Sequence, residues 1–215
     1  MKVDFKKKFE YETKYCLTAD KARYAKFLTH YEVLKKISKI KGDIVECGVF
    51  RGTSITRFAI ISRLLKIKKK IIGFDNFNNV IPVTKFGRDL KIRKKWIKDT
   101  KGGNSISVKK LTNVFKAHKI KKFQFIKGDV EKTVPKFVKN QKKLKVALLN
   151  IDIDYFESTK VCLESFYPYI SRGGIILLDN YKYGYGETKF IQSFFNPKKI
   201  QSYFKERPYY IIKQS

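Results

Sequence analysis

Short apolar runs alternate along the chain with longer amphipathic segments. Five such runs, rich in branched side chains, lie at residues 44–45, 71–74, 123–126, 146–149 and 175–178. Runs of this kind are typical of parallel strands that are buried on both faces. In the segments between them, apolar residues recur every three or four positions, which predicts helices. The alternation predicts an α/β fold with a doubly wound, mostly parallel sheet.

The two ends of the chain and one internal segment depart from this pattern. Residues 1–40 carry a helical apolar stripe and are predicted to form an N-terminal helical extension of the domain at 41–215. Segments 200–204 and 209–213 flank a turn-prone Glu-Arg-Pro sequence and predict a C-terminal antiparallel hairpin. The polar, basic insert 76–105 is long for a connection inside a domain, so we expect it, together with the N-terminal extension, to shape a ligand pocket or to form a lid over it.

Basic residues outnumber acidic ones by a wide margin, giving a formal net charge of +30. Such a charge attracts nucleic acids and phosphorylated molecules. However, 41 of the basic residues are Lys and only 8 are Arg, and they are spread along the whole chain. Specific readers of nucleic acid rely on Arg. The charge therefore indicates a solvated surface, with a phosphorylated or nucleotide-linked substrate as the alternative.

Cysteine usage and hydropathy suggest a setting for the chain. Cys16, Cys47 and Cys162 lie far apart and show no metal-site spacing. The polar N-terminus lacks a secretory signal, and no apolar run approaches the roughly 20 residues of a membrane span. We therefore expect a cytoplasmic protein that does not span a membrane.

A glycine-containing turn, ECGVFRGTS, follows the first predicted strand. Glu46 and Gly48 at the strand end allow a ligand to approach the backbone, and Thr53 or Ser54 can cap the next helix. The turn lacks the glycines of the G-x-G-x-x-G dinucleotide motif. An acidic residue suits the ammonium group of an amino-acid ligand such as S-adenosylmethionine. A tight turn without a ligand is the alternative.

Acidic residues also end the next two predicted strands. Asp75 ends the run Ile-Ile-Gly-Phe, and a carboxylate in that place suits the two hydroxyls of a ribose. Asp129 follows the third run and can accept a hydrogen bond from an adenine amino group. Each residue could instead cap a helix.

Polar side chains follow the fourth and fifth strands as well. Asp152 ends the fourth, and Asp179 and Asn180 end the fifth. In such sheets ligands bind beyond the carboxyl ends of the strands, so these oxygens should converge. Carboxylate and amide oxygens suit Mg²⁺. Asp154 points away if the fourth strand continues, which makes it a structural residue.

Taken together, the segments VECGVFRG, IIGFDNF, KGDVEKTVP and IDIDYFESTKVCLESFYPYISRGGIILLDNY resemble one known family. They are similar to the macrocin/mycinamicin/novobiocin type of sugar O-methyltransferases. The resemblance covers roughly residues 43–181 and, more loosely, the tail RPYYIIK. It implies a Rossmann-like class I methyltransferase fold that uses S-adenosylmethionine and Mg²⁺. It also implies that the methyl group goes to a hydroxyl of a small molecule: a sugar, a nucleotide-linked sugar or another small-molecule acceptor.

The resemblance assigns roles to individual residues. Asp152 would be both a metal ligand and the general base, with Asp179 and Asn180 as the other metal ligands. Asn180 stands where the family has an aspartate, so this site carries one negative charge fewer. The remaining residues would hold the cofactor: Glu46, Gly48, Arg51, Gly52, Thr53, Ser54, Asp75 and Asp129.

Three other functions remain as alternatives. A nucleic-acid methyltransferase would use the same cofactor and the basic surface. A non-catalytic nucleotide-binding protein would keep the acidic residues without using them. A dehydrogenase is disfavoured by the missing glycines. A homodimer or higher homo-oligomer is compatible with all of them.

Overall fold

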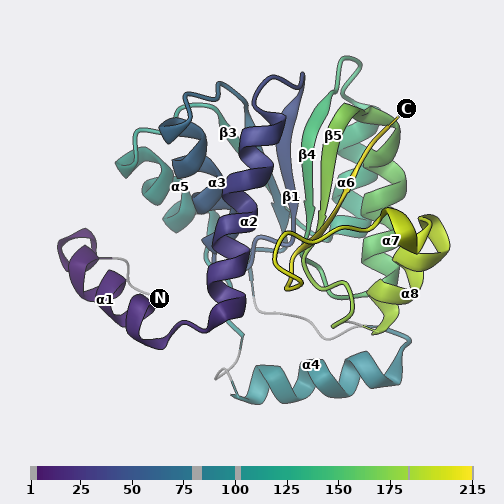
Figure 1. The fold of residues 1–215 in the computed structure, drawn as a ribbon, viewed down its shortest axis with the longest axis horizontal. Helices are drawn as coiled ribbons and strands as arrows, with labels where there is room; N and C mark the ends of the chain where they lie inside the picture. Colours follow the sequence, from purple (N-terminus) through teal and green to yellow (C-terminus); the bar gives the residue numbers. More distant parts are fainter. Residues whose placement is uncertain (1–3, 79–83, 100–102, 184, 215) are drawn as a thin grey trace.

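The structure is a computed structural model that describes residues 4–78, 84–99, 103–183 and 185–214 (Figure 1). Its centre is a six-stranded sheet in the order β3-β2-β1-β4-β5-β6. The strands are β1 (Asp43–Cys47), β2 (Ile71–Asp75), β3 (Phe123–Lys127), β4 (Val146–Ile151), β5 (Ile170–Leu178) and β6 (Tyr209–Ile212). Strands β1 to β5 are parallel and β6 is antiparallel to β5. The predicted fold class and its five parallel strands are confirmed.

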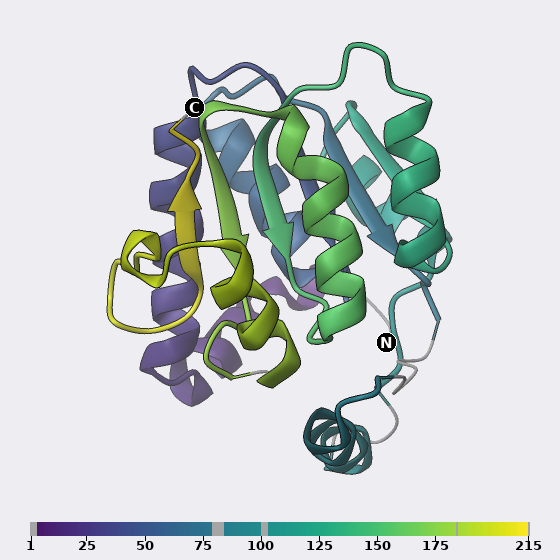
Figure 2. The ribbon, with the colours of Figure 1, turned by 90° about the vertical axis from the view of Figure 1, so that its right-hand side faces the viewer.

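Helices cover both faces of this sheet (Figure 2). On one face lie α2 (Lys21–Ile37), α3 (Thr53–Leu64) and α5 (Val108–Ala117). On the other lie α6 (Val130–Lys139), α7 (Phe156–Phe166) and α8 (Tyr185–Phe194). Each residue of β4 is buried, which explains its apolar run from Val146 to Leu149; the buried Asn150 that follows donates to Glu46. Two hydrophobic clusters, one on each face, make up the core.

The N-terminal extension contains α2 and the shorter α1 (Lys8–Thr18), after a 3₁₀ turn at Phe5–Lys7. In the second half of α2, Leu34 and Ile37 are fully buried against the sheet. Phe27 and Leu28, apolar residues of the same helix, are instead 43% and 45% exposed. Both belong to the first half of α2, and this half of the helix passes near the carboxyl ends of the parallel strands (Figure 1). α1 contributes no buried residue.

The predicted C-terminal hairpin is confirmed in its antiparallel pairing but not in both of its strands. β6 pairs with β5. Residues 200–204, predicted as a strand, make only the bridge between Gln201 and Tyr210. The Ser202 hydroxyl donates to the Glu206 carbonyl at 2.6 Å, so the chain closes a turn here and does not extend the sheet. A 3₁₀ turn at Pro197–Lys199 precedes it.

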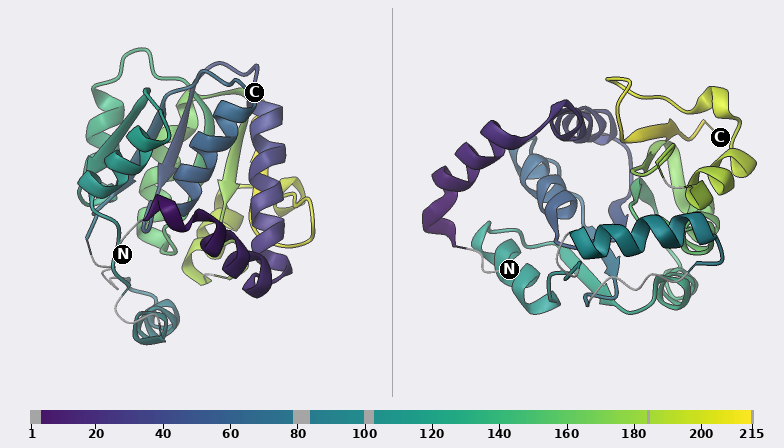
Figure 3. Two further views of the ribbon diagram at one scale, coloured as in Figure 1. Left: turned by 90° about the vertical axis from the view of Figure 1, so that its left-hand side faces the viewer. Right: turned by 90° about the horizontal axis from the view of Figure 1, so that it is seen from below.

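Part of the insert 76–105 forms a helix, α4 (Gly87–Asp99), which the sequence did not predict. It lies below the carboxyl ends of the parallel strands (Figure 3), where its first turn contacts the start of α8. Residues 79–83 and 100–102 of the insert lie outside the described residues. Among the described residues, no helix combines the length and apolar character needed to cross a membrane.

His30 on α2 generates a stability prediction, because it is fully buried against Phe58 at a ring distance of 4.5 Å. Burial, then the charges of Lys26 and Arg57, hold the pKa of His30 well below its usual range. The unfolded chain takes up a proton near pH 6.5 that the folded chain does not, so stability falls as the pH drops. Between pH 7 and pH 5 this should cost about 2 kcal/mol.

Urea unfolding of a His30→Phe variant should therefore show a shallower loss of stability with acid than the wild type. His118→Phe, the same change at a half-buried histidine, should keep the wild-type slope. Equal slopes for wild type and His30→Phe would contradict the assignment.

Candidate active site

Acidic side chains from four parallel strands lie at the carboxyl edge of the sheet. Glu46 lies on β1, Asp75 ends β2, and Asp152 and Asp179 directly follow β4 and β5. The chain leaves β1 for β2 on one side and returns to β4 on the other, so the strand order reverses between β1 and β4. Ligands of open α/β sheets bind outside the strand ends at such a point.

Gly48 allows β1 and β4 to end in close contact. The Asp152 amide donates to the Cys47 carbonyl at 2.9 Å, and the Gly48 amide donates to the Phe74 carbonyl at 2.9 Å. Gly48 has a φ of +92°, and a Cβ atom there would lie 2.0 Å from the Asp152 carbonyl oxygen. The glycine thus makes room for the backbone of Asp152.

The turn after β1 leads directly into α3. Gly52, in the left-handed region at φ +77°, is the N-cap residue and makes no side-chain cap hydrogen bond. The expectation that Thr53 or Ser54 caps this helix is wrong, because both lie inside its first turn. Ser54 is buried, whereas Arg51 is exposed and its Nε lies 3.4 Å from the Asn104 carbonyl oxygen.

Asp75 holds this turn in place. Its Oδ2 accepts from the Phe50 amide at 2.8 Å and its Oδ1 from the Phe77 amide at 2.7 Å. Burial raises the pKa of Asp75, and these backbone donors oppose the rise. Each carboxylate oxygen can accept more than one hydrogen bond, so the contacts leave capacity for a ligand hydroxyl.

Asp129 caps α6, as its alternative interpretation predicts. Its Oδ1 accepts from the Glu131 amide at 3.0 Å, and the carboxylate is exposed. The neighbouring Gly128 donates to the Asp75 carbonyl at 2.9 Å, which joins the ends of β2 and β3. The cap does not exclude an adenine contact, which stays a prediction.

Glu46 is buried with one oxygen engaged and one free. Its Oε1 accepts from Asn150 Nδ2 at 2.7 Å, while Oε2 has no hydrogen-bond partner among the described residues. Burial and the nearby charge of Asp152 raise the pKa of Glu46 well above its usual range. An unpartnered buried carboxyl oxygen is costly to the fold and suits a ligand donor.

Lys26 of α2 lies between the two aspartates at the ends of β4 and β5. Its Nζ is 2.7 Å from Asp179 Oδ1 and 3.4 Å from Asp152 Oδ2. Side-chain exposure is 13% for Lys26, 3% for Asp179 and 25% for Asp152. Asp152 is therefore the carboxylate of this group that solvent or an acceptor can reach most easily.

Asn180 links the ion cluster formed by Lys26, Asp152 and Asp179 to Arg207 in the C-terminal segment. Its Nδ2 donates to Asp152 Oδ1 at 3.1 Å, and its Oδ1 accepts from Arg207 Nη1 at 3.2 Å. The guanidinium can only donate, which fixes the amide with its oxygen toward Arg207. The amide nitrogen therefore faces Asp152.

The members of the ion cluster differ in the direction in which their pKa values are shifted. Burial, then the charge of Asp179, raises the pKa of Asp152 to about 6. Burial, the largest single effect on Asp179, acts in the same direction, but the charge and hydrogen bond of Lys26 together with the Arg207 charge outweigh it and lower the Asp179 pKa. Burial lowers the pKa of Lys26, and the two carboxylates outweigh it, so the Lys26 pKa is raised. Asp152 is thus the member that can exchange a proton near neutral pH.

The three side chains expected to bind Mg²⁺ do not fit that ion as they are arranged. Mg²⁺ requires about six oxygen ligands in a near-ideal octahedron. Here the ammonium of Lys26 contacts both carboxylates, and Asn180 turns its nitrogen toward Asp152. No cluster of three or more His, Cys, Asp or Glu residues suited to a metal occurs in the described part of the chain.

Sequence reasoning missed three basic residues of this edge: Lys26, Arg93 and Arg207. Arg93 of α4 pairs with Asp154, which turns out of the sheet at φ +75° because β4 ends at Ile151. Lysines are too numerous for Lys26 to stand out, but Arg is scarce, and the scarcity could have marked Arg93 and Arg207.

Side chains in the first two turns of α4 attach this helix to the rest of the domain. Asp89 accepts from the Tyr185 and Gly186 amides at the start of α8, at 2.9 and 2.7 Å. The Arg93 guanidinium pairs with Asp154 and lies over the Tyr155 ring at 5.8 Å. These contacts hold α4 next to Asp154 and thus near the ion cluster, as a lid would require.

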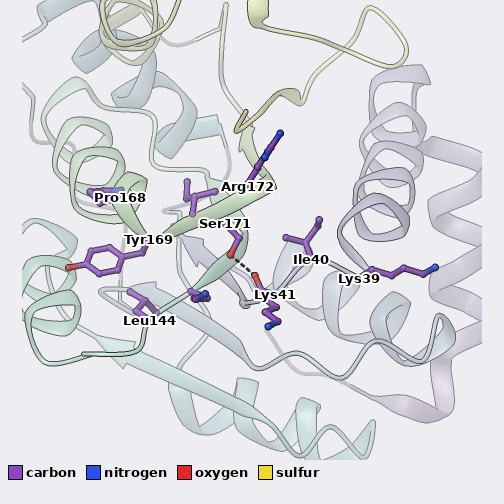
Figure 4. A pocket seen from close by; sticks show the side chains of 10 residues that line it. Lys39, Ile40, Lys41, Leu144, Pro168, Tyr169, Ser171 and Arg172 are labelled. Atoms are coloured by element: carbon purple, nitrogen blue, oxygen red, sulfur yellow. Dashed lines mark hydrogen bonds between the residues drawn. The ribbon is translucent and has the colours of Figure 1, made fainter. Parts of the chain in front are cut away.

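A separate pocket lies at the opposite, amino edge of the sheet (Figure 4). Its lining includes Lys41 before β1, Lys145 before β4 and Ser171 near the start of β5. The Ser171 hydroxyl donates to the Lys41 carbonyl at 2.7 Å. None of the predicted site residues lines this pocket, so it is distinct from the candidate site.

Comparison with known families gives one clear match. The family model of macrocin-O-methyltransferase (TylF) matches residues 18–207. No curated protein matches the sequence.

Solved structures share the fold at low sequence identity. CalS11, a calicheamicin methyltransferase, is 20% identical with a TM-score of 0.75, covering 94% of this chain and 84% of that one. The O-methyltransferase NovP is 19% identical with a TM-score of 0.72, covering 88% and 79%. An rRNA methylase from Streptococcus thermophilus is 10% identical with a TM-score of 0.51, covering 87% and 95%.

The tight contact at Gly48 predicts that Gly48→Ala destabilises the protein by at least about 2 kcal/mol. The added Cβ meets the Asp152 backbone, and a left-handed φ disfavours alanine. Gly87→Ala is the matched control, because a Cβ at that position has nothing within 4 Å. Urea unfolding of both variants measures the difference. A Gly48→Ala protein as stable as the control would contradict this role.

Proposed function

Since the chain belongs to the macrocin O-methyltransferase (TylF) family, we propose that it methylates a hydroxyl group of a sugar or nucleotide-linked sugar. It is an S-adenosylmethionine-dependent O-methyltransferase. The observation that carries the proposal for this site is Asp152, a partly exposed carboxylate at the strand-order reversal with a pKa of about 6.

The cofactor would lie at the ends of β1, β2 and β3. The free Oε2 of Glu46 can accept from the ammonium of S-adenosylmethionine. Asp75 and Asp129 would contact the ribose and the adenine. Gly48, Arg51, Gly52, Thr53 and Ser54 would form the turn beside the amino-acid end. The amides that Asp75 already binds support a ligand-ready turn, because they fix it before the ligand arrives.

S-adenosylmethionine, when bound, would supply the methyl group from its positively charged sulfur to the acceptor oxygen and would leave as S-adenosylhomocysteine. The hydroxyl proton passes to the Asp152 carboxylate as general base. Much of the rate comes from alignment of oxygen, carbon and sulfur.

The insert with α4 and the start of α2 would enclose the acceptor. α4 is tied to Asp154 by Arg93, and the acceptor would lie between α4 and Asp152. No step above passes through the magnesium ion that the family resemblance implies, because its three expected ligands do not fit that ion as they are arranged.

The first test separates chemistry from binding with Asp152→Asn. Turnover should fall by about 10²–10⁴-fold, because the base is lost. Binding of S-adenosylhomocysteine, followed by calorimetry, should change little, because the adenosine contacts lie on other strands. Asp43→Asn, the same change at the start of β1, is the matched control and should retain turnover. Full activity in Asp152→Asn would refute the assigned base.

The cofactor site is tested by Asp75→Asn with the same ligand. Its affinity should fall by about tenfold or more, since charge-assisted hydrogen bonds to the ribose are weakened. Circular dichroism and urea unfolding check that the turn survives. Unchanged affinity in a folded variant would remove Asp75 from the site.

The acceptor class is tested by offering nucleotide sugars, free glycosides and RNA to the same enzyme with labelled cofactor. Methyl transfer to a sugar hydroxyl is expected. RNA binding should be weak and lost at moderate salt, because it rests on scattered lysines. Salt-resistant methylation of one RNA sequence would replace the sugar with RNA as the acceptor.

A further inference from the structure

We propose that Lys26 is the fixed cation of this active site, so that methyl transfer here proceeds without a divalent metal ion. The inference rests on the proposed function, because it concerns the same carboxylates. It starts from the disagreement between the expected magnesium ligands and their observed partners.

The position of Lys26 carries the inference. The Nζ atom contacts Asp179 at 2.7 Å and Asp152 at 3.4 Å, so it lies between the oxygens that would otherwise bind a metal. A divalent ion placed there would meet the ammonium charge at short range. In a buried setting that repulsion is strong, because the effective dielectric constant is low.

Lys26 reaches this place because of how α2 is anchored. Leu34 and Ile37 fix the second half of the helix in the core, and Ala25 is also buried. The first half then passes the carboxyl edge of the sheet (Figure 1). Only 13% of the Lys26 side chain remains exposed. The contact of Lys26 with the two aspartates is therefore part of the buried interior and does not lie on the surface.

The charges around Lys26 match a single positive charge better than a double one. The carboxylates of Asp152 and Asp179 lie beside the cations of Lys26 and Arg207, with the neutral amide of Asn180 between them. An aspartate at position 180 would add a negative charge, whereas asparagine can donate to Asp152 and accept from Arg207 at once.

Lys26 acts as a positioning residue through the two carboxylates. Its charge keeps Asp152 close to Asp179 despite their repulsion, and so aims the Asp152 carboxylate at the acceptor hydroxyl. When Asp152 takes up the hydroxyl proton, Lys26 keeps its own proton and remains paired with Asp179. Asp152 alone takes part in the proton transfer.

Metal binding without turnover is the decisive measurement, because it does not depend on knowing the acceptor. Mn²⁺ is titrated into the wild type, Asn180→Asp, and the double variant Lys26→Met with Asn180→Asp, and bound ion is counted by electron paramagnetic resonance. The wild type should bind no Mn²⁺ at the site. The double variant should gain one ion, since it loses the ammonium and regains a carboxylate.

Two results would overturn the inference. One is a wild-type site that binds one Mn²⁺ and loses it in Asp179→Asn. The other is a folded double variant that still binds none, because removal of Lys26 should open the site. If the double variant does not fold, the other two proteins still decide the question: the wild type and Asn180→Asp both keep the Lys26 ammonium, so both should bind no Mn²⁺ at the site.

Turnover supplies the second readout. The wild type should keep full activity after chelation with EDTA, and Lys26→Met should lose about 100-fold in kcat while S-adenosylhomocysteine binding persists. Lys35→Met, a change at an exposed position of the same helix, should stay at the wild-type rate. Loss of wild-type activity in EDTA, restored by Mg²⁺, would refute metal independence. A wild type that binds S-adenosylhomocysteine but methylates no acceptor would refute the proposed function alone.

Discussion

The burial of acidic side chains at one edge of the sheet is the constraint on which the site depends. Glu46, Asp179 and Glu187 are almost wholly buried there, and Asp152 is close to them. Buried carboxylates must lose their charge or find partners. Burial favours the neutral form of Glu46 and Glu187, since it raises the pKa of each well above its usual range, and the free oxygen of Glu46 can still gain a partner from a ligand. Asp179 finds its partner in Lys26.

This constraint explains why distant parts of the chain meet at the carboxyl edge. The first half of α2 brings Lys26, the insert brings Arg93 to Asp154, and the C-terminal segment brings Arg207 to Asn180. Each segment supplies a cation where the strand ends supply anions or an amide. The edge at which we propose that the substrate binds is therefore also the place where the extension, the insert and the tail are held to the sheet.

The parallel strands could be read from the sequence because burial on both faces leaves a continuous apolar run, as in β4. The strand-end residues followed from the same argument, and the structure brings Asp152, Asp179 and Asn180 together. The side chains from other elements that contact these residues could not be predicted from the sequence. Lys26 is one of 41 lysines, and nothing local marks it as buried. Helix α4 was missed because its polar sequence packs little against the core, and 200–204 was mistaken for a strand because a local turn satisfies its backbone.

Anomalous X-ray scattering distinguishes a lysine ammonium from a metal ion between Asp152 and Asp179. Crystals of the complex with S-adenosylhomocysteine, grown with Mn²⁺, can be measured at a wavelength where manganese scatters anomalously. The account predicts adenosine at the ends of β1, β2 and β3, the Lys26 ammonium between Asp152 and Asp179, and no anomalous peak there. A manganese peak between the two aspartates, with Lys26 displaced, would contradict it.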